Sequence, residues 1–375
     1  MIRRLSFSAL ALLLAPALAA ERPAVLPDTM EQRLIACASC HARKDVNDAY
    51  FPHISGKPAG YLYNQLQNFR AGRRQYPLMT YMVDHMSDAY MRDIATYFSN
   101  QPLAVVPNTA AGVASFGGRA AFFGKVARDQ LGGIYYHDIR AQGVAFDTQP
   151  LDGPPPTARS MIFVTPDGER SMNTYLGACV ELGPEDVEAD KAAGAKVTYF
   201  EGYLWDPPRA KEAIRLTAKH AHAAGREVSM TLSDSFCVDR YRDEFLDLMR
   251  SGTVDVVFAN ESELKALYQT SSFEAGLEQI RRDCRLAAVT RSEKGSVIVR
   301  GDETIVVEAI AIGELVDTTG AGDLYAAGFL FGYTAGLDLQ RCGDLGSLAA
   351  GLVIQQIGPR PRQNLRQEAQ AAGLL

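Results

Sequence analysis

Short apolar runs separated by amphipathic stretches dominate the second half of the chain. Six runs rich in β-branched residues are the candidate strands: residues 160–166, 196–202, 227–233, 254–260, 285–290 and 296–300. Two intervening segments, 207–225 and 239–252, repeat apolar residues at helical spacing. Strands and helices that alternate in this way predict a parallel sheet covered by helices. Ligands of such sheets bind beyond the carboxyl ends of the strands.

A different pattern, without candidate strands, occupies residues 21–102. Two sets of apolar residues share helical spacing: Tyr61, Leu62, Leu66 and Phe69 in one, and Met91, Ile94, Tyr97 and Phe98 in the other. Ser87, followed by Asp88, is a plausible cap for the second helix. The pattern predicts helices in this part of the chain.

The first twenty residues, MIRRLSFSALALLLAPALAA, combine a basic start, an apolar run and small residues at Ala17 and Ala19. This layout predicts a signal peptide over residues 1–20, cleaved after Ala19 or Ala20, and hence a periplasmic protein. The alternatives are a buried N-terminal helix and an uncleaved anchor. The run is short for a bilayer, which needs ~20 residues, so we expect no membrane span after cleavage.

Composition narrows the class of protein. The chain has 375 residues, of which 47% are hydrophobic and 22% charged, and this length suits two or three domains. The net charge is −6 and there is no basic block, which argues against a nucleic-acid partner. Four scattered cysteines, Cys179, Cys237, Cys284 and Cys342, are usual in reduced cytosol and unusual in an exported protein.

The segment LIACASCHARK carries two cysteines and a histidine in the order C-x-x-C-H. Cys37 and Cys40 have the spacing to add to the two vinyl groups of one haem, and His41 then lies under the iron as an axial ligand. A zinc site needs two further ligands, for which His53 is one candidate. A thioredoxin-like motif needs a preceding buried strand that the sequence does not supply.

A six-coordinate haem needs a second axial ligand, and methionine is common in electron carriers. The candidates are Met79, Met82 and Met86, with His85 as a further donor, although methionine in a core is the default interpretation. Residues 34–100 resemble one half of a class I c-type cytochrome of the c4/c553 group. The resemblance implies Met79 as the sixth ligand, a single haem c, an all-α domain and redox partner proteins.

The stretch VDTTGAGDLYAAGFLFGYTAG, residues 316–336, predicts a phosphate site. A strand ends, Gly320, Ala321 and Gly322 form a turn, and an apolar helix begins. Unpaired amides at a helix N-terminus bind anions. A carboxylate there, Asp323, suits a general base beside a phosphate. The alternative is a glycine-rich turn that Asp323 merely caps.

Several segments of the second half resemble the PfkB/ribokinase family of kinases in the family's order. They are DTTGAGD, FANESE with Asn260 and Glu263, TRSEKGS with Thr290 and Gly295, residues 108–132, and DGERSMNTYLGA with Arg170. The last is closest to adenosine-kinase-like members. The resemblance implies transfer of the ATP γ-phosphate to a nucleoside or sugar hydroxyl, with Asp323 as base and Mg²⁺ on the phosphates. It gives Asn260, Glu263, Thr290 and Gly295 to nucleotide and Mg²⁺, and Arg170 to the acceptor site.

The start of that family's pattern is missing. Asn108 stands where the first signature has its acceptor-binding asparagine, but Ala104, Val105 and Val106 replace the glycines before it. The first strand, its aspartate and part of the lid have no counterpart. We therefore expect a cytochrome domain at 21–102, a junction at 103–107, and a truncated α/β ribokinase-like domain at 108–375 that phosphorylates poorly.

These observations support an exported monohaem cytochrome for electron transfer, fused to a kinase domain of doubtful competence. The kinase part is then inert or recently fused, or the join is an artefact of sequence assembly. The alternative is a functional adenosine or sugar kinase with the cytochrome as passenger, for which a cytoplasmic location is expected. A third hypothesis is a kinase gated by the haem.

Overall fold

The computed structural model describes residues 30–34, 37, 59–99, 107–164 and 170–375. The chain separates into two compact units, residues 1–53 and 54–375. The described part of the first unit contains helix α1 (Met30–Arg33). The expected signal peptide lies outside the described residues. Among the residues that are described, no helix combines the length and the apolarity that crossing a bilayer requires.

Three helices follow in the second unit, namely α3 (Ala59–Arg70), α4 (Pro77–Val83) and α5 (Asp88–Ser99). The two helices expected here from apolar spacing, in α3 and α5, are confirmed. Their inward faces form a small core around Phe69 and Met91, which are buried because both lie on the apolar stripes.

Polar contacts fix the start of α5. The Ser87 hydroxyl accepts a hydrogen bond from the Tyr90 amide at 3.1 Å, so the expected cap is confirmed. Arg70 donates to the Asp88 carboxylate at 2.5 Å, and Tyr63 donates to it at 3.1 Å. These two donors lower the pKa of Asp88 and join α3 to α5.

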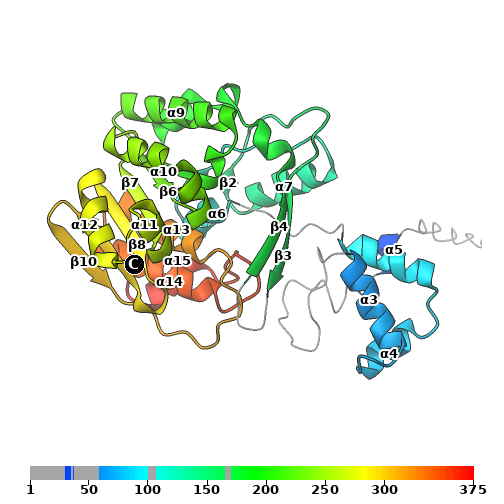
Figure 1. The fold of residues 1–375 in the computed structure, drawn as a ribbon. Helices are drawn as coiled ribbons and strands as arrows, with labels where there is room; N and C mark the ends of the chain where they lie inside the picture. The colour runs from blue at the N-terminus through cyan, green and yellow to red at the C-terminus, as the bar shows by residue number, and fades with distance from the viewer. Residues whose placement is uncertain (1–29, 35–36, 38–58, 100–106, 165–169) are drawn as a thin grey trace, which may run out of the picture. The chain divides into compact units, whose positions relative to one another are not determined.

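The remaining elements build an α/β domain (Figure 1). Its helices are α6 (Asn108–Ser115), α7 (Gln130–Ala141), α8 (Ala189–Gly194), α9 (Pro208–Ala223), α10 (Ser235–Arg250), α11 (Glu261–Leu267), α12 (Phe273–Asp283), α13 (Ala321–Ala335), α14 (Leu339–Val353) and α15 (Leu365–Ala371). Its strands are β1 (Ala120–Ala121), β2 (Val144–Ala145), β3 (Arg159–Val164), β4 (Arg170–Tyr175), β5 (Val197–Glu201), β6 (Glu227–Thr231), β7 (Val256–Asn260), β8 (Leu286–Thr290), β9 (Ser296–Arg300) and β10 (Glu303–Val307). Short 3₁₀ helices η1 (Gly177–Glu181), η2 (Pro184–Asp186), η3 (Gly202–Trp205) and η4 (Ser292–Lys294) connect them.

The main sheet has the strand order β10-β9-β8-β7-β6-β5. Strands β5 to β8 are parallel, as expected, but β8, β9 and β10 pair antiparallel, so the expectation of a purely parallel sheet is wrong. The reason is connection length. A parallel neighbour needs a crossover of a dozen or more residues, whereas only residues 291–295 and 301–302 link these three strands.

Two short sheets lie outside the main one. The expected strand at 160–166 is present as β3, but it pairs antiparallel with β4 and not with the main sheet. Strands β1 and β2 pair in parallel through two residues each. Within the described chain β5 is therefore an outermost strand of the main sheet.

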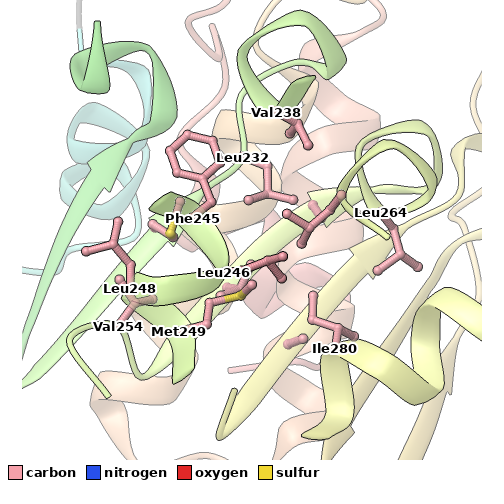
Figure 2. Close-up of a cluster of buried hydrophobic side chains, with 14 of the residues drawn as sticks. Leu232, Val238, Phe245, Leu246, Leu248, Met249, Val254, Leu264 and Ile280 are labelled. Atoms are coloured by element: carbon pink, nitrogen blue, oxygen red, sulfur yellow. The ribbon is translucent and has the colours of Figure 1, made fainter. Parts of the chain in front are cut away.

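Helices cover both faces of the main sheet. On one face, α9 to α12 bury a large cluster that includes Leu232, Phe245 and Ile280 (Figure 2). On the other face, α13 and α14 pack on the alternate residues of the same strands, such as Phe258 and Ile298. Successive residues of a strand point to opposite faces, so the continuous apolar runs of β7 and β8 suit a sheet covered on both sides.

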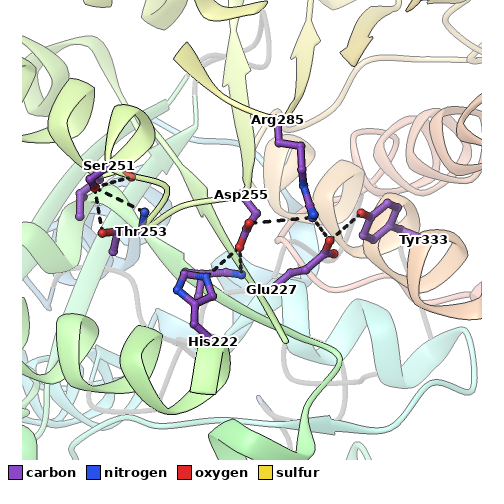
Figure 3. Close-up of polar contacts among 9 residues, drawn as sticks. His222, Glu227, Ser251, Thr253, Asp255, Arg285 and Tyr333 are labelled. Carbon is purple, nitrogen blue, oxygen red and sulfur yellow. Dashed lines mark hydrogen bonds and ion pairs between the residues drawn. The ribbon is translucent and has the colours of Figure 1, made fainter. Parts of the chain in front are cut away.

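A polar network ties the amino ends of the parallel strands together (Figure 3). The Asp255 carboxylate accepts a hydrogen bond from the Val228 amide at 2.8 Å and contacts His222 Nε2 at 3.0 Å. Arg285 pairs with Glu227 and lies 3.9 Å from Asp255. The network holds β6, β7 and β8 in register at the end opposite to their carboxyl ends.

Replacing Asp255 with alanine tests the weight of this network. We expect Asp255→Ala to lower the free energy of unfolding by about 1–3 kcal/mol, because the Val228 amide and Arg285 lose a carboxylate partner. Urea unfolding measures the change. Asp239→Ala, on the exposed side of α10, is the matched control and should change stability by less than about 0.5 kcal/mol. Equal effects of the two substitutions would contradict the assigned role.

Candidate active site

The glycine turn before α13 is built as the sequence predicts. Gly320 has φ 83°, a left-handed conformation that favours glycine, and a Cβ there would lie 2.5 Å from Cβ of Pro359. Ala321 and Gly322 begin the helix, and the space beside Gly322 is open. The start of α13 is thus open beside Gly322, although the Ala321 amide already donates to the Thr318 carbonyl at 3.3 Å, and the expected phosphate site remains a prediction.

Asp317 anchors this turn. Its carboxylate is 2% exposed and accepts hydrogen bonds from the Thr319 amide at 2.9 Å and from the Gly358 amide at 2.8 Å. The turn is therefore fixed to the segment that follows α14. A phosphate site benefits from such rigidity because its amides need no reorganisation when the anion binds.

Asp323 and Asn108 meet although they are 215 positions apart. The Asn108 side-chain amide donates to Asp323 Oδ2 at 2.7 Å. Helix α6 approaches α13 closely, since a Cβ on Gly112 would lie 2.5 Å from Cβ of Ala327. The hydrogen bond to Asp323 places Asn108 beside the residue expected to be the base. The expected contact of Asn108 with the acceptor remains a prediction.

Glu201 joins this site and was not among the expected residues. It ends β5, and its pKa is raised to about 8, first by burial and then by the nearby charge of Asp323. The pKa of Tyr199 is raised well above its usual value by burial and then by Glu201 and Asp323, with a smaller effect of Glu263. These carboxylates therefore converge at the carboxyl end of the sheet. The available sequence signal was a charged residue that closes an otherwise apolar strand.

Asn260 and Glu263 form a reciprocal cap at the start of α11. Asn260 Oδ1 accepts from the Glu263 amide at 2.9 Å, and Glu263 Oε2 accepts from the Asn260 amide at 2.9 Å. Burial raises the pKa of Glu263 to about 7. The pair thus has a structural role and places a buried carboxyl at the carboxyl end of β7, and its expected role toward nucleotide and Mg²⁺ remains a prediction.

Thr290 and Gly295 flank the turn between β8 and β9. Thr290 ends β8 and is in register with Asn260 on β7, so both lie at the carboxyl edge of the sheet. Gly295 has φ 75°, and a Cβ there would lie 2.0 Å from the Val307 carbonyl oxygen. The glycine is therefore required by backbone packing, and its expected nucleotide contact remains a prediction.

The other expected site residues lie elsewhere. Arg170 begins β4 and pairs through its backbone with Val164. Cys37 lies at a helical position, whereas Cys40 and His41 are outside the described residues. Met79 lies in α4 and packs against the core around Phe69 and Met91. This is the packing role weighed for methionine, and the expected haem ligation remains a prediction.

The site fits a magnesium nucleotide in its donor set. The space beside Gly322 at the start of α13 is open, and the Glu263 carboxyl supplies the oxygen chemistry that Mg²⁺ prefers. In the described part of the chain no three His, Cys, Asp or Glu side chains cluster as a ready metal site.

Comparison with known structures defines the class of the fold. An adenosine kinase from Sinorhizobium meliloti is 72% identical, with a TM-score of 0.70 over 71% of this chain and 81% of that one. A probable sugar kinase from Rhizobium etli is 70% identical, with a TM-score of 0.71 over 72% of this chain and 82% of that one. The α/β domain is therefore ribokinase-like.

The family follows from the sequence match. The model of the pfkB family of carbohydrate kinases matches residues 106–364, and the chain belongs to this family. A probable chloroplastic fructokinase from Arabidopsis thaliana is 27% identical over 247 residues. The chain spans 63% of the length of that relative, and the match covers 63% of this chain.

Glu201 makes stability depend on pH. Its pKa is about 8 in the folded chain against an ordinary 4.5, so the folded state holds a proton that the unfolded state releases. Stability then falls as the pH rises from 4.5 to 8. We expect Glu201→Gln to be more stable than the parent at pH 9, by on the order of 1–3 kcal/mol, and the difference to vanish near pH 4.5.

Urea unfolding between pH 4.5 and pH 9 measures this difference. Glu212→Gln, on the exposed side of α9, is the control and should follow the parent at every pH. A Glu201→Gln curve parallel to that of the parent would show that Glu201 is ionised in the folded chain.

Proposed function

We propose that the pfkB domain transfers the γ-phosphate of ATP to a hydroxyl of adenosine or a related nucleoside, with Asp323 as the general base. The observation that carries the proposal is the position of Asp323. It lies in the first turn of α13, beside the glycine turn that opens the helix and within hydrogen-bond distance of Asn108. A carboxylate next to an anion site is suited to accept the proton of a hydroxyl that attacks a phosphate.

Each side chain of the site has a defined task in this proposal. Asn108 orients the Asp323 carboxylate through its amide. The amides of Gly320 to Asp323 stabilise charge on the transferred phosphoryl group. Mg²⁺, held through water near Asn260 and Glu263, neutralises the phosphates of ATP. The protonated Glu201 carboxyl, beside Asp323, hydrogen-bonds a second hydroxyl of the acceptor.

The choice of a nucleoside rests on two observations. The Sinorhizobium meliloti protein described as an adenosine kinase shares 72% of its residues with the matched part of this chain. In addition, two large aromatic side chains are exposed just after the carboxyl ends of β5 and β6: Tyr203 is 49% and Phe236 77% exposed. Ser233 fixes Tyr203, since its hydroxyl accepts from the Tyr203 amide at 3.3 Å. Exposed rings beside a hydroxyl-binding site suit stacking on a base.

Ordinary kinases turn over about 1–100 substrates per second. We expect the full chain to turn over adenosine more slowly than this range, because part of the acceptor wall is missing. Asp323→Asn should lower that rate by about 10²–10⁴-fold, since the hydroxyl loses its base. Adenosine-dependent release of ADP measures the rate. Asp302→Asn, in the exposed β9–β10 turn, is the control. Equal rates in Asp323→Asn and the parent would refute Asp323 as the base. A rate of the parent within the ordinary range would refute the expectation that part of the acceptor wall is missing.

The motif at residues 37–41 supports a second function for the same chain. We propose that Cys37 and Cys40 bind one haem covalently, with His41 and Met79 as axial ligands, in a domain over residues 21–102 that exchanges electrons with redox partner proteins. The support is the C-x-x-C-H order together with Met79 at the edge of a helical core. Covalent attachment takes place outside the cytoplasm, so this function requires the export expected from residues 1–20.

Absorption spectra of the exported chain test the haem proposal. Haem that survives acid–acetone extraction and gives a c-type α band is expected in the parent. Cys40→Ala should weaken the attachment, whereas Met79→Ala should keep the attached haem and lose the methionine-to-iron band. Met82→Ala is the matched control and should leave the spectrum unchanged. Colourless exported protein would overturn the proposal without affecting the kinase function.

A further inference from the structure

The segment that follows α14, residues 356–365, makes contacts that the proposed function leaves unexplained. The Gly358 amide donates to the Asp317 carboxylate at 2.8 Å. Pro359 packs against Gly320, where an added Cβ would lie 2.5 Å from Cβ of the proline. The segment therefore lies directly against the glycine turn that opens α13.

Gln356 fixes the shape of this segment. Its side chain is 5% exposed, donates to the Arg360 carbonyl, and accepts a hydrogen bond from the Arg362 amide at 3.1 Å. Buried amide side chains are stable only with such partners. Since one side chain holds both residues, Arg360 leaves the segment at a defined position.

The Arg360 side chain joins the segment to α7. Its guanidinium pairs with the Asp138 carboxylate, 222 positions away in the chain. The two side chains are 21% and 29% exposed, so water and salt screen the pair less than they screen a surface pair. Arg360 Nε is buried and has no hydrogen-bond partner among the described residues. Because a buried N–H without a partner is costly, this conformation of Arg360 depends on the ion pair.

Helix α6 is held by α7 and by the same segment. Ile139 of α7 and Ala111 of α6 belong to one buried apolar cluster. At the last residue of α6, the Ser115 hydroxyl accepts a hydrogen bond from the Leu365 amide at 3.1 Å. Movement of α7 or of residues 356–365 would therefore also move α6.

These contacts form a closed ring of elements. Helix α13 packs on α6, α6 packs on α7, and residues 356–365 join α7 to the start of α13. The ring includes the base, because Asn108 at the start of α6 donates to Asp323 of α13 at 2.7 Å. Helix α7 also lies near the acceptor side: burial, followed by the charge of Glu201, raises the pKa of Tyr135.

We propose that Arg360 is a positioning residue, whose ion pair with Asp138 holds α7 and α6 against α13. The pair thereby keeps Asn108 in the place where its amide orients Asp323. Arg360 acts through the two helices and not by contact with a substrate. A misplacement of about 1 Å can slow a reaction by about 10²-fold, so a distant ion pair can control the rate. The effect on the rate rests on the proposed function, whereas the holding of α6 does not.

Hydrogen exchange of the full chain tests the holding of α6. We expect Arg360→Ala to speed exchange of the α6 amides at least about tenfold and to leave α12, on the far side of the sheet, unchanged. Asp138→Asn should have the same effect, because it removes the same pair. Arg360→Lys keeps the charge and should stay closer to the parent. Arg362→Ala, an exposed side chain of the same segment, is the matched control and should leave α6 unchanged.

Adenosine-dependent release of ADP tests the effect on the base. Arg360→Ala should lower kcat about tenfold and change the KM for ATP by less than about twofold. In an Asp323→Asn background the same substitution should lower the rate by less than about twofold, because a base that is absent cannot be misplaced. A role in stability alone would lower the rate equally in both backgrounds.

Three results would overturn the proposal. One is unchanged exchange of α6 in Asp138→Asn and in whichever Arg360 variant melts cooperatively. Another is an equal loss of rate in the two backgrounds. The third is a KM for ATP that rises in Arg360→Ala while kcat and α6 exchange stay unchanged, which would make Arg360 a nucleotide contact. A parent without turnover would reject the proposed function, and the exchange experiment would then decide on the holding of α6.

Discussion

The close approach of α6 to α13 is the constraint on which the site depends. Gly112 allows it, because any larger residue would meet the Ala327 and Leu324 side chains. The approach brings Asn108 to Asp323 across 215 positions of sequence. It also aligns the start of α6 with the amides that open α13. Without this contact the base, its orienting amide and the anion site would belong to separate parts of the domain.

The two ends of the parallel strands differ in electrostatic character. At the amino ends, Arg285 pairs with Glu227 and lies near Asp255, and the Asp255 carboxylate also accepts a hydrogen bond from the Val228 amide. These contacts stabilise the register of the strands. At the carboxyl ends, burial and the nearby charge of Asp323 raise the pKa of Glu201 to about 8. Carboxyls with raised pKa values are typical of sites arranged for proton transfer.

Local signals in the sequence predicted the parts of the structure that local rules control. The six predicted strands, the helices at 207–225 and 239–252, the cap at Ser87 and the turn at Gly320 follow from spacing, apolar runs and glycine chemistry. The antiparallel edge does not follow from the apolar runs, because these carry no information about strand direction. The short connections 291–295 and 301–302 determine it. Glu201 was missed because its role arises from Asp323, which only the fold brings near. The NESE stretch predicts a nucleotide contact, and the structure shows the capping box of Asn260 and Glu263, a role that the resemblance does not imply.

The outer edge of β5 and the raised carboxyl pKa occur at the same corner of the domain, and this has a physical consequence. Among the described residues, the outward backbone groups of Val197 and Tyr199 have no backbone partner, and both residues belong to β5, the strand that ends in Glu201. Each feature lowers the stability of β5 and α6 relative to the core between β6 and β9. An acceptor bound at this corner would add hydrogen-bond partners and exclude water from Glu201. Binding of an acceptor and ordering of this corner are therefore coupled. The affinity for the acceptor falls if the corner has to be ordered on binding, because ordering costs conformational entropy.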